Sequence, residues 1–118
     1  MRVLIVEDEP IIAMEIEAIV LQIRPSAEIV TAMSVREALL AVERELDLAF
    51  LDIDVTDGKT YELAITLQTR KVPFTFVTGA GMADAPPCLK GSALVAKPFS
   101  PLEILRSIET AEADRHEA

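Results

Sequence analysis

The chain has 118 residues and is 51% hydrophobic, which suits one folded domain with a core of its own and leaves no room for two. Its 11 basic and 20 acidic side chains give a formal net charge of −9, so repulsion argues against binding to bare nucleic acid or to an anionic membrane surface. The lack of a signal peptide or a long apolar run, and a single cysteine that excludes an internal disulfide, predict a cytoplasmic protein without a membrane span.

Apolar runs alternate with amphipathic stretches in the first half of the chain. Val3–Val6 is a continuous apolar run, typical of a strand that is covered on both faces. Helical spacing follows over residues 10–23, with a proline at its first position. Residues 27–32 predict a second strand. A Ser-x-x-Glu capping box at residues 34–37 then starts a second helix, whose apolar face extends to residue 46.

The second half continues the alternation up to one irregular segment. Leu48–Leu51 and Phe74–Val77 predict strands, and residues 61–68 between them have a weaker helical pattern. Gly79–Ser92 contains three glycines and a Pro-Pro pair, so we expect a short helical turn or an irregular loop in place of a fourth helix. Residues 93–96 predict the last strand.

The last helix begins at Ser100, where a cap, a first-turn proline and a capping-box glutamate coincide, and it extends to about Ala111. The residues after 111 form a polar tail that we expect to fray. Repeated β-α units imply right-handed crossovers. We therefore predict one α/β domain over residues 1–118, with a doubly wound, flavodoxin-like five-stranded parallel sheet and a shortened or irregular fourth helix.

Polar residues directly follow four of the five predicted strands. They are Glu7 and Asp8 after the first strand, Asp52 after the third, Thr78 after the fourth and Lys97 after the fifth. In a parallel sheet these positions share the carboxyl edge, where ligands bind at the point at which the strand order reverses. The sequence therefore predicts that three carboxylates, a hydroxyl and an ammonium converge.

Such a cluster suits a divalent cation and a phosphoryl group. Close carboxylates repel one another unless a cation or a proton lies between them, and a set of oxygen ligands favours Mg²⁺. A carboxylate is also able to act as a nucleophile and become an aspartyl phosphate. A hydroxyl and an ammonium would then stabilise the transferred phosphoryl oxygens.

Taken in order, Glu7-Asp8, Asp52, Thr78-Gly79 and Lys97-Pro98-Phe99 resemble the motifs of the receiver domain of two-component response regulators, from Met1 to about Ala111. The resemblance implies that Asp52 accepts a phosphoryl group from a histidine kinase or a histidine phosphotransfer protein. It gives Thr78 the role of the switch hydroxyl and Lys97 that of the phosphate-contacting lysine. It also implies a cis Lys97–Pro98 bond.

The same resemblance implies an Mg²⁺ site. The side chains of Asp8 and Asp52 would bind the ion, Glu7 would assist through water, and Asp54 would contribute its backbone carbonyl. Three features depart from the family pattern: the first acid is Glu7, the segment from Asp52 to Gly58 is short and has no proline, and Leu94 occupies the position of the usual aromatic switch. We therefore expect an intact site and an altered output face.

The leading hypothesis is a stand-alone receiver in a phosphorelay, whose output is contact with an unidentified downstream protein. It would not be an enzyme beyond self-phosphorylation and autodephosphorylation at Asp52. A second hypothesis is a degenerate receiver that binds its partner independently of phosphorylation, motivated by Leu94 and the irregular fourth helix.

A third hypothesis is a phosphatase of the haloacid dehalogenase type, because Asp52-x-Asp54-x-Thr56 after an apolar strand resembles the first motif of those enzymes. Their motif opens the chain, whereas here two predicted strands precede it. Their second acidic pair follows the lysine, whereas here the acids at 7–8 precede everything, and the chain has no room for a substrate-selecting cap.

Overall fold

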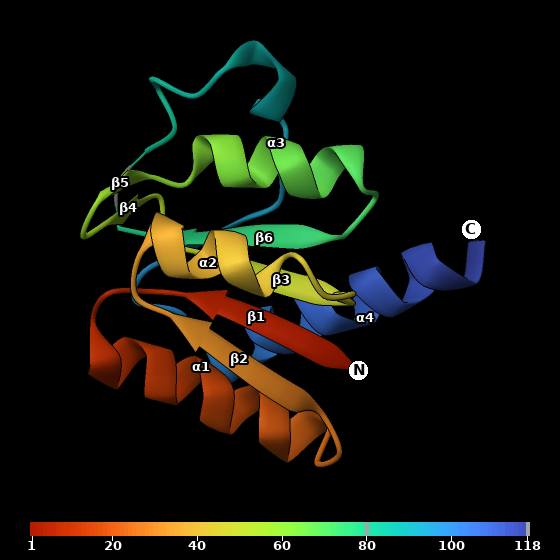
Figure 1. Cartoon of the computed structure of the whole chain (residues 1–118). Helices are drawn as coiled ribbons and strands as arrows, with labels where there is room; N and C mark the ends of the chain where they lie inside the picture. The colour runs from red at the N-terminus through yellow and green to blue at the C-terminus, as the bar shows by residue number, and fades with distance from the viewer. Residues whose placement is uncertain (80, 118) are drawn as a thin grey trace.

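A five-stranded parallel sheet with the strand order β2-β1-β3-β6-β7 forms the centre of the computed structural model, which describes residues 1–79 and 81–117 (Figure 1). Ala80 and Ala118 lie outside the described residues. The strand order reverses between β1 and β3, which confirms the predicted doubly wound topology. The strands are β1 (Arg2–Val6), β2 (Glu28–Ala32), β3 (Leu48–Leu51), β6 (Phe74–Thr78) and β7 (Leu94–Ala96).

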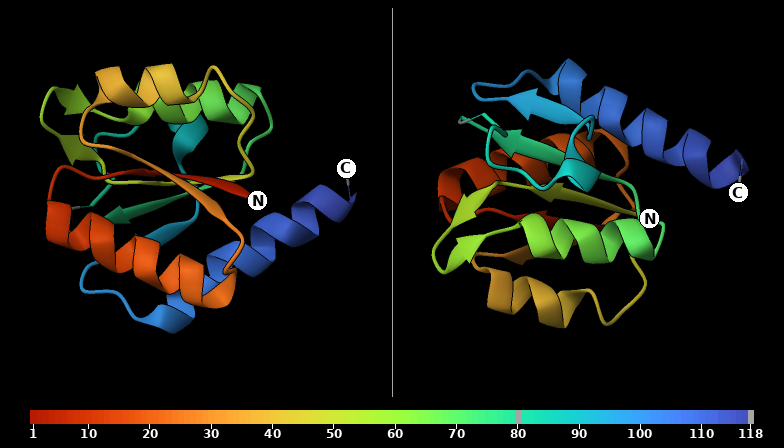
Figure 2. Two further views of the ribbon diagram at one scale, coloured as in Figure 1. Left: turned by 60° about the horizontal axis from the view of Figure 1, so that its bottom comes forward. Right: turned by 90° about the horizontal axis from the view of Figure 1, so that it is seen from above.

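Helices cover both faces of the sheet (Figure 2). Helices α1 (Pro10–Ile23) and α4 (Pro101–Glu117) lie on one face, and α2 (Val35–Ala41) and α3 (Tyr61–Thr69) lie on the other. Alternate residues of β1 serve the two cores: Val3 faces α1 and α4, whereas Leu4 faces α2 and α3. Because both faces are covered, the central strands β1 and β3 carry continuous apolar runs, whereas the edge strand β2 has two exposed polar residues, Glu28 and Thr31.

Two helix ends differ from the prediction. Helix α2 ends at Ala41 and not near residue 46, because Glu43 and Arg44 donate backbone hydrogen bonds three residues back and turn the chain toward β3. Leu46 is buried all the same, from a non-helical position. Helix α4 continues to Glu117, beyond the predicted end near Ala111, and Glu112 in this stretch accepts two hydrogen bonds of 2.6 and 2.8 Å from Arg24, which follows α1.

The irregular fourth helix is confirmed. Among the described residues between β6 and β7, the helical structure is a single 3₁₀ turn, η1 (Pro87–Leu89), and Leu89 from this turn is buried. One small element was not predicted: β4 (Asp54–Val55) and β5 (Gly58–Lys59) form an antiparallel hairpin after β3. Gly58 adopts a φ of 139°, a conformation that favours glycine. Within the described residues, every helix is too short or too polar to cross a lipid bilayer.

Candidate functional site

Backbone hydrogen bonds align the strand ends that carry the predicted site. The amide of Asp52 donates to the carbonyl of Val6 at 2.9 Å, and the amide of Lys97 donates to the carbonyl of Thr78, also at 2.9 Å. These bonds continue the β1–β3 and β6–β7 pairings by one residue. The side chains that follow β1, β3 and β7, together with Thr78 at the end of β6, are therefore presented at one edge of the sheet, as the sequence predicts.

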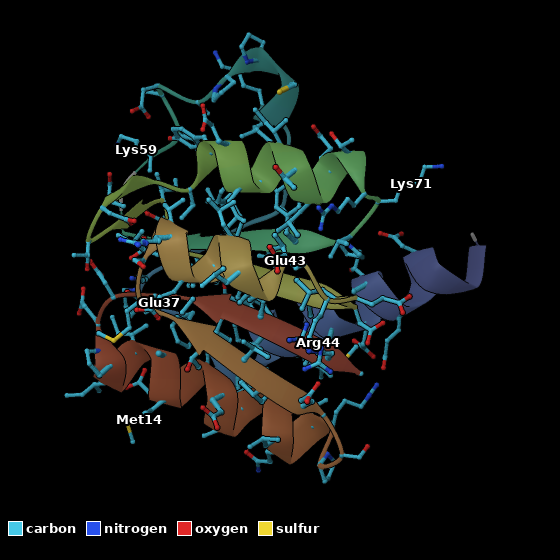
Figure 3. The ribbon with its side chains drawn as sticks, viewed as in Figure 1. Met14, Glu37, Glu43, Arg44, Lys59 and Lys71 are labelled. Carbon is cyan, nitrogen blue, oxygen red and sulfur yellow. The ribbon has the colours of Figure 1, made fainter. Side chains whose placement is uncertain are left out.

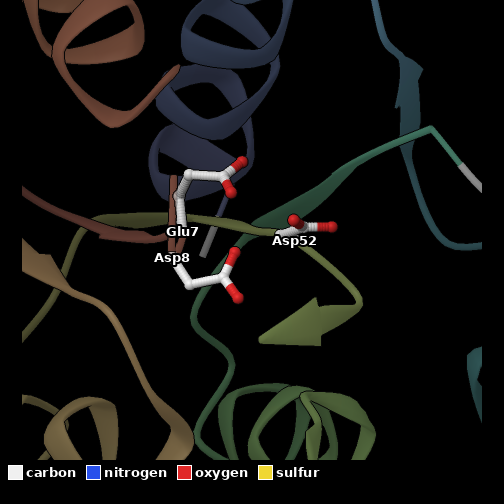
Figure 4. A group of neighbouring side chains, drawn as sticks. All are labelled: Glu7, Asp8 and Asp52. Atoms are coloured by element: carbon white, nitrogen blue, oxygen red, sulfur yellow. The ribbon is translucent and has the colours of Figure 1, made fainter. Parts of the chain in front are cut away.

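Three carboxylates meet at this edge (Figure 4). Glu7, Asp8 and Asp52 each offer an oxygen within 4.8 Å of the others, a spacing that suits one shared cation. Glu7 is 2% exposed and Asp52 is 9% exposed, whereas Asp8 is half-buried and is the most accessible member of the cluster. Carboxylate oxygens are the ligands that Mg²⁺ prefers, and the residues present therefore fit the ion that the sequence predicts.

Lys97 supplies the positive charge of the pocket. Its Nζ donates to Glu7 Oε1 at 2.7 Å and to Asp52 Oδ2 at 3.1 Å. Burial opposes the charge on the ammonium, but the bonds to the two carboxylates outweigh burial and raise the pKa of Lys97 above its ordinary value. Lys97 is therefore a permanent cation beside Asp52. The Lys97–Pro98 peptide bond is cis, as the resemblance to receiver domains implied.

Glu7 is the most perturbed acid of the site. Desolvation by burial raises its pKa from 4.5 to about 7, and the nearby charge of Asp52 acts in the same direction. Hydrogen bonds from Lys97 and from the amide of Glu9, the latter at 3.2 Å, offset part of this effect. Near neutral pH the pocket thus holds a carboxyl group that exchanges a proton readily, and a bound cation would favour its ionised form.

Thr78 and Asp54 occupy different surroundings. Thr78 ends β6 and is buried, with its carbonyl bonded to Lys97, which places it at the same edge as the acids. Asp54 lies in the hairpin, and its carboxylate accepts a 2.7 Å hydrogen bond from Lys59 instead of joining the acidic cluster. A metal contact through the Asp54 carbonyl stays a prediction.

Thr60 holds Asp52 in place and was missed by the sequence reasoning. Its Oγ1 donates to the carbonyl of Asp52 at 2.6 Å, and its amide donates to the carbonyl of Ile53 at 2.9 Å. The residue is fully buried and directly precedes α3. A threonine before a helical pattern signals an N-cap, but here the hydroxyl does not cap the helix and serves the backbone of Asp52 instead.

One family matches most of the chain: residues 3–109 match the family described as the response regulator receiver domain. The chain is also 33% identical over 122 residues to the sensory transduction protein LytT of Enterococcus faecalis, in an alignment that covers 100% of this chain and 50% of LytT. The chain thus spans half the length of this curated relative.

Solved structures give the same result. A CheY-like response regulator receiver domain protein from Methanospirillum hungatei superposes with a TM-score of 0.85 at 26% identity, covering 99% of this chain and 98% of that one. SdrG from Sphingomonas melonis superposes with a TM-score of 0.79 at 30% identity, covering 95% of this chain and 96% of its own.

Proposed function

The chain belongs to the response regulator receiver domain family, and we propose that Asp52 accepts a phosphoryl group from a histidine kinase or a histidine phosphotransfer protein. In this transfer a carboxylate oxygen of Asp52 attacks phosphorus and forms a new oxygen–phosphorus bond. The bond from phosphorus to the donor's imidazole nitrogen breaks, and that nitrogen leaves with the electron pair and takes up a proton. The product is an aspartyl phosphate.

The observation that carries this proposal is the pairing of Asp52 with Lys97 beside two further acids. Asp52 retains some exposure at the edge of the sheet, so a donor can reach its carboxylate, and Lys97 Nζ lies 3.1 Å from Asp52 Oδ2. An ammonium in this position stabilises the negative charge of the transferred group. Thr78, presented at the same edge, is the hydroxyl that we assign to a phosphoryl oxygen.

Glu7, Asp8 and Asp52 are the residues that would hold Mg²⁺, with the carbonyl of Asp54 as a fourth ligand. When bound, the ion neutralises charge between the carboxylates and the incoming phosphoryl group. Glu7 and Asp8 follow β1 and Asp52 follows β3, so both sides of the strand-order reversal contribute to the site.

Incubation of the protein with acetyl phosphate and Mg²⁺, followed by intact mass measurement, tests the proposal. We expect the mass of one phosphoryl group to be added to the wild type, and no addition to Asp52→Asn or to the wild type with a chelator in place of Mg²⁺. Asp54→Asn is the matched control, because it alters an acid two residues away that keeps its backbone carbonyl; it should still be modified. An unchanged wild-type mass, or modification of Asp52→Asn, would contradict the proposal.

We further propose that output is contact with another protein. A receiver that binds its partner equally well without phosphorylation is the alternative, and it is favoured by the 48% exposed Leu94 and by the single 3₁₀ turn before β7. Asp52→Asn distinguishes the two once a partner is identified: the proposal predicts that the variant loses the change of partner affinity that acetyl phosphate produces, and the alternative predicts no such change in either protein.

A further inference from the structure

The connection between β6 and β7 depends on side chains for its position. Over residues 82–92 its backbone hydrogen bonds are short-range: Ala85 donates to Met82, Leu89 to Pro86 and Ser92 to Leu89. Such bonds shape the segment locally. Nε2 of Gln68 attaches it to α3 by donating to the carbonyl of Cys88 at 3.1 Å, and the side chain of Leu89 is fully buried. Side-chain contacts therefore decide where the connection lies.

Asp84 is the polar attachment of this connection on the side of the pocket. Its Oδ1 accepts a 2.7 Å hydrogen bond from the hydroxyl of Tyr61, and its Oδ2 lies 3.4 Å from Nζ of Lys59. Lys59 stands on the hairpin beside the connection and also donates to Asp54 at 2.7 Å (Figure 3). We call these four residues, Asp54, Lys59, Tyr61 and Asp84, the Asp84 cluster.

Tyr61 touches the parts of the molecule that surround the pocket. It is 7% exposed, its ring packs edge-on against Phe76 with the ring centres 6.2 Å apart, and its hydroxyl reaches Asp84. Phe76 belongs to β6, the strand that ends at Thr78. The residue before Tyr61 is Thr60, which holds the carbonyl of Asp52. Burial and the bond to Asp84 raise the pKa of Tyr61 to about 12, so its hydroxyl remains a donor across the physiological range.

Lys59 is shared unequally between two carboxylates. Its contact with Asp54 is 2.7 Å and its contact with Asp84 is 3.4 Å, and the side chain is 45% exposed. A phosphoryl group on Asp52 would add negative charge two residues from Asp54. That charge favours movement of the ammonium toward the pocket, at the expense of its longer contact with Asp84.

We propose that Tyr61 and Lys59, acting through Asp84, transmit the state of Asp52 to the connection between β6 and β7; this inference rests on the proposed phosphorylation of Asp52. In the unmodified protein the Asp84 cluster holds the connection against α3 and the hairpin. Modification of Asp52 loosens it and exposes the surface of residues 82–92 to a partner. The cluster thereby provides a coupling between Asp52 and the connection, whereas β7 has the aliphatic Leu94 at the position of the usual aromatic switch.

Hydrogen exchange of the full chain, with and without beryllofluoride and Mg²⁺ as the phosphoryl mimic, tests this inference. In the wild type we expect the amides of residues 82–92 to exchange several-fold faster when the mimic is bound. In Tyr61→Phe the same amides should exchange fast from the start, and the mimic should change little further. The inference would be overturned if the amides of Tyr61→Phe exchanged as slowly as those of the wild type and responded fully to the mimic.

Three further variants separate coupling from a general loss of structure. Asp84→Asn keeps an acceptor for Tyr61 but loses its charge attraction for Lys59, so exchange should be intermediate; Lys59→Gln should match it. Thr66→Val is the control, because it removes a hydroxyl from α3 that donates to the carbonyl of Glu62 in the same helix. It should behave as the wild type, and acceleration as large as in Tyr61→Phe would overturn the inference.

Intact mass measurement of each variant after treatment with acetyl phosphate distinguishes a failure of this inference from a failure of the proposed function. If Asp52 is modified in the wild type and the connection does not respond, the inference alone is wrong. If Asp52 is not modified, the proposed function and the inference are both overturned.

Discussion

Lys97 Nζ lies 2.7 Å from Oε1 of Glu7, and this ion pair joins the end of the last strand to the end of the first across a chain separation of 90 residues. Glu7 is nearly inaccessible to water, so its carboxylate has lost hydration that Lys97 partly replaces. The pair also fixes the ammonium within reach of Asp52. The first predictions concern this pocket.

Replacing Lys97 should affect both chemistry and stability. Lys97→Gln leaves two shielded carboxylates without their cation. We therefore expect the free energy of unfolding, measured at pH 8 with a chelator present, to fall by about 1–3 kcal/mol. Modification by acetyl phosphate should slow at least tenfold. Lys90→Gln is the control, because Lys90 is an exposed lysine that follows η1; this substitution should change neither property. Equal urea midpoints for the Lys97 and Lys90 variants would contradict the role of Lys97.

The raised pKa of Glu7 predicts a pH dependence of stability. The pKa is about 7 in the folded protein against 4.5 ordinarily, so the folded state retains a proton that the unfolded chain releases. This contribution to stability is fully present below pH 4.5 and is lost as the pH rises through about 7. Glu7→Gln removes this pH-dependent contribution. The free energy of unfolding of the variant, relative to that of the wild type, should therefore rise by on the order of 2 kcal/mol as the pH increases over this range. Urea unfolding with a chelator, at pH 4.5 and pH 8, measures the difference; parallel profiles would contradict it.

Thr60 should stabilise the pocket through one hydrogen bond. Thr60→Val keeps the side-chain shape but removes the 2.6 Å bond to the carbonyl of Asp52, which should cost about 1–2 kcal/mol of unfolding free energy. Thr60→Ser retains the hydroxyl and should recover most of that loss. Urea unfolding gives both values, and an equally large loss in the serine variant would show that packing and not the hydrogen bond is responsible.

Mg²⁺ should stabilise the folded protein through the acidic cluster. A cation that binds only the folded state raises the unfolding free energy with its concentration, so the melting temperature should increase as Mg²⁺ is added. Asp8→Asn should abolish most of the increase. Glu9→Gln is the matched control, because Glu9 adjoins the cluster in sequence but is not part of it. A wild-type melting temperature that is independent of Mg²⁺ would contradict the metal site.

The sequence predicts most of this fold because its central strands β1 and β3 contain short, continuous apolar runs covered on both sides. The Leu48–Leu51 prediction coincides with β3, and the acid that follows it lies at the expected edge. The glycines and prolines after β6 likewise correctly indicate that a full helix does not form. The local sequence pattern is enough to predict an element whose backbone conformation is set by residues close to one another in the chain.

Contacts between distant residues explain what was missed. Each strand of the β4–β5 hairpin has two residues, too few for a periodic pattern, and the hairpin is held partly by Asp57, whose carboxylate accepts from the amides of Val35 and Arg36 at 2.7 and 3.1 Å. These bonds also lower the pKa of Asp57. The bond between Tyr61 and Asp84 spans 23 positions and has no signature in either segment.

The most direct measurement is the location of the phosphoryl group. Treatment with acetyl phosphate and Mg²⁺, reduction with borohydride, and peptide mass mapping convert an aspartyl phosphate into homoserine at the modified position. The account predicts homoserine at position 52 in the wild type, at the same position in Asp54→Asn, and nowhere in Asp52→Asn. Homoserine at another aspartate, or at none, would contradict it.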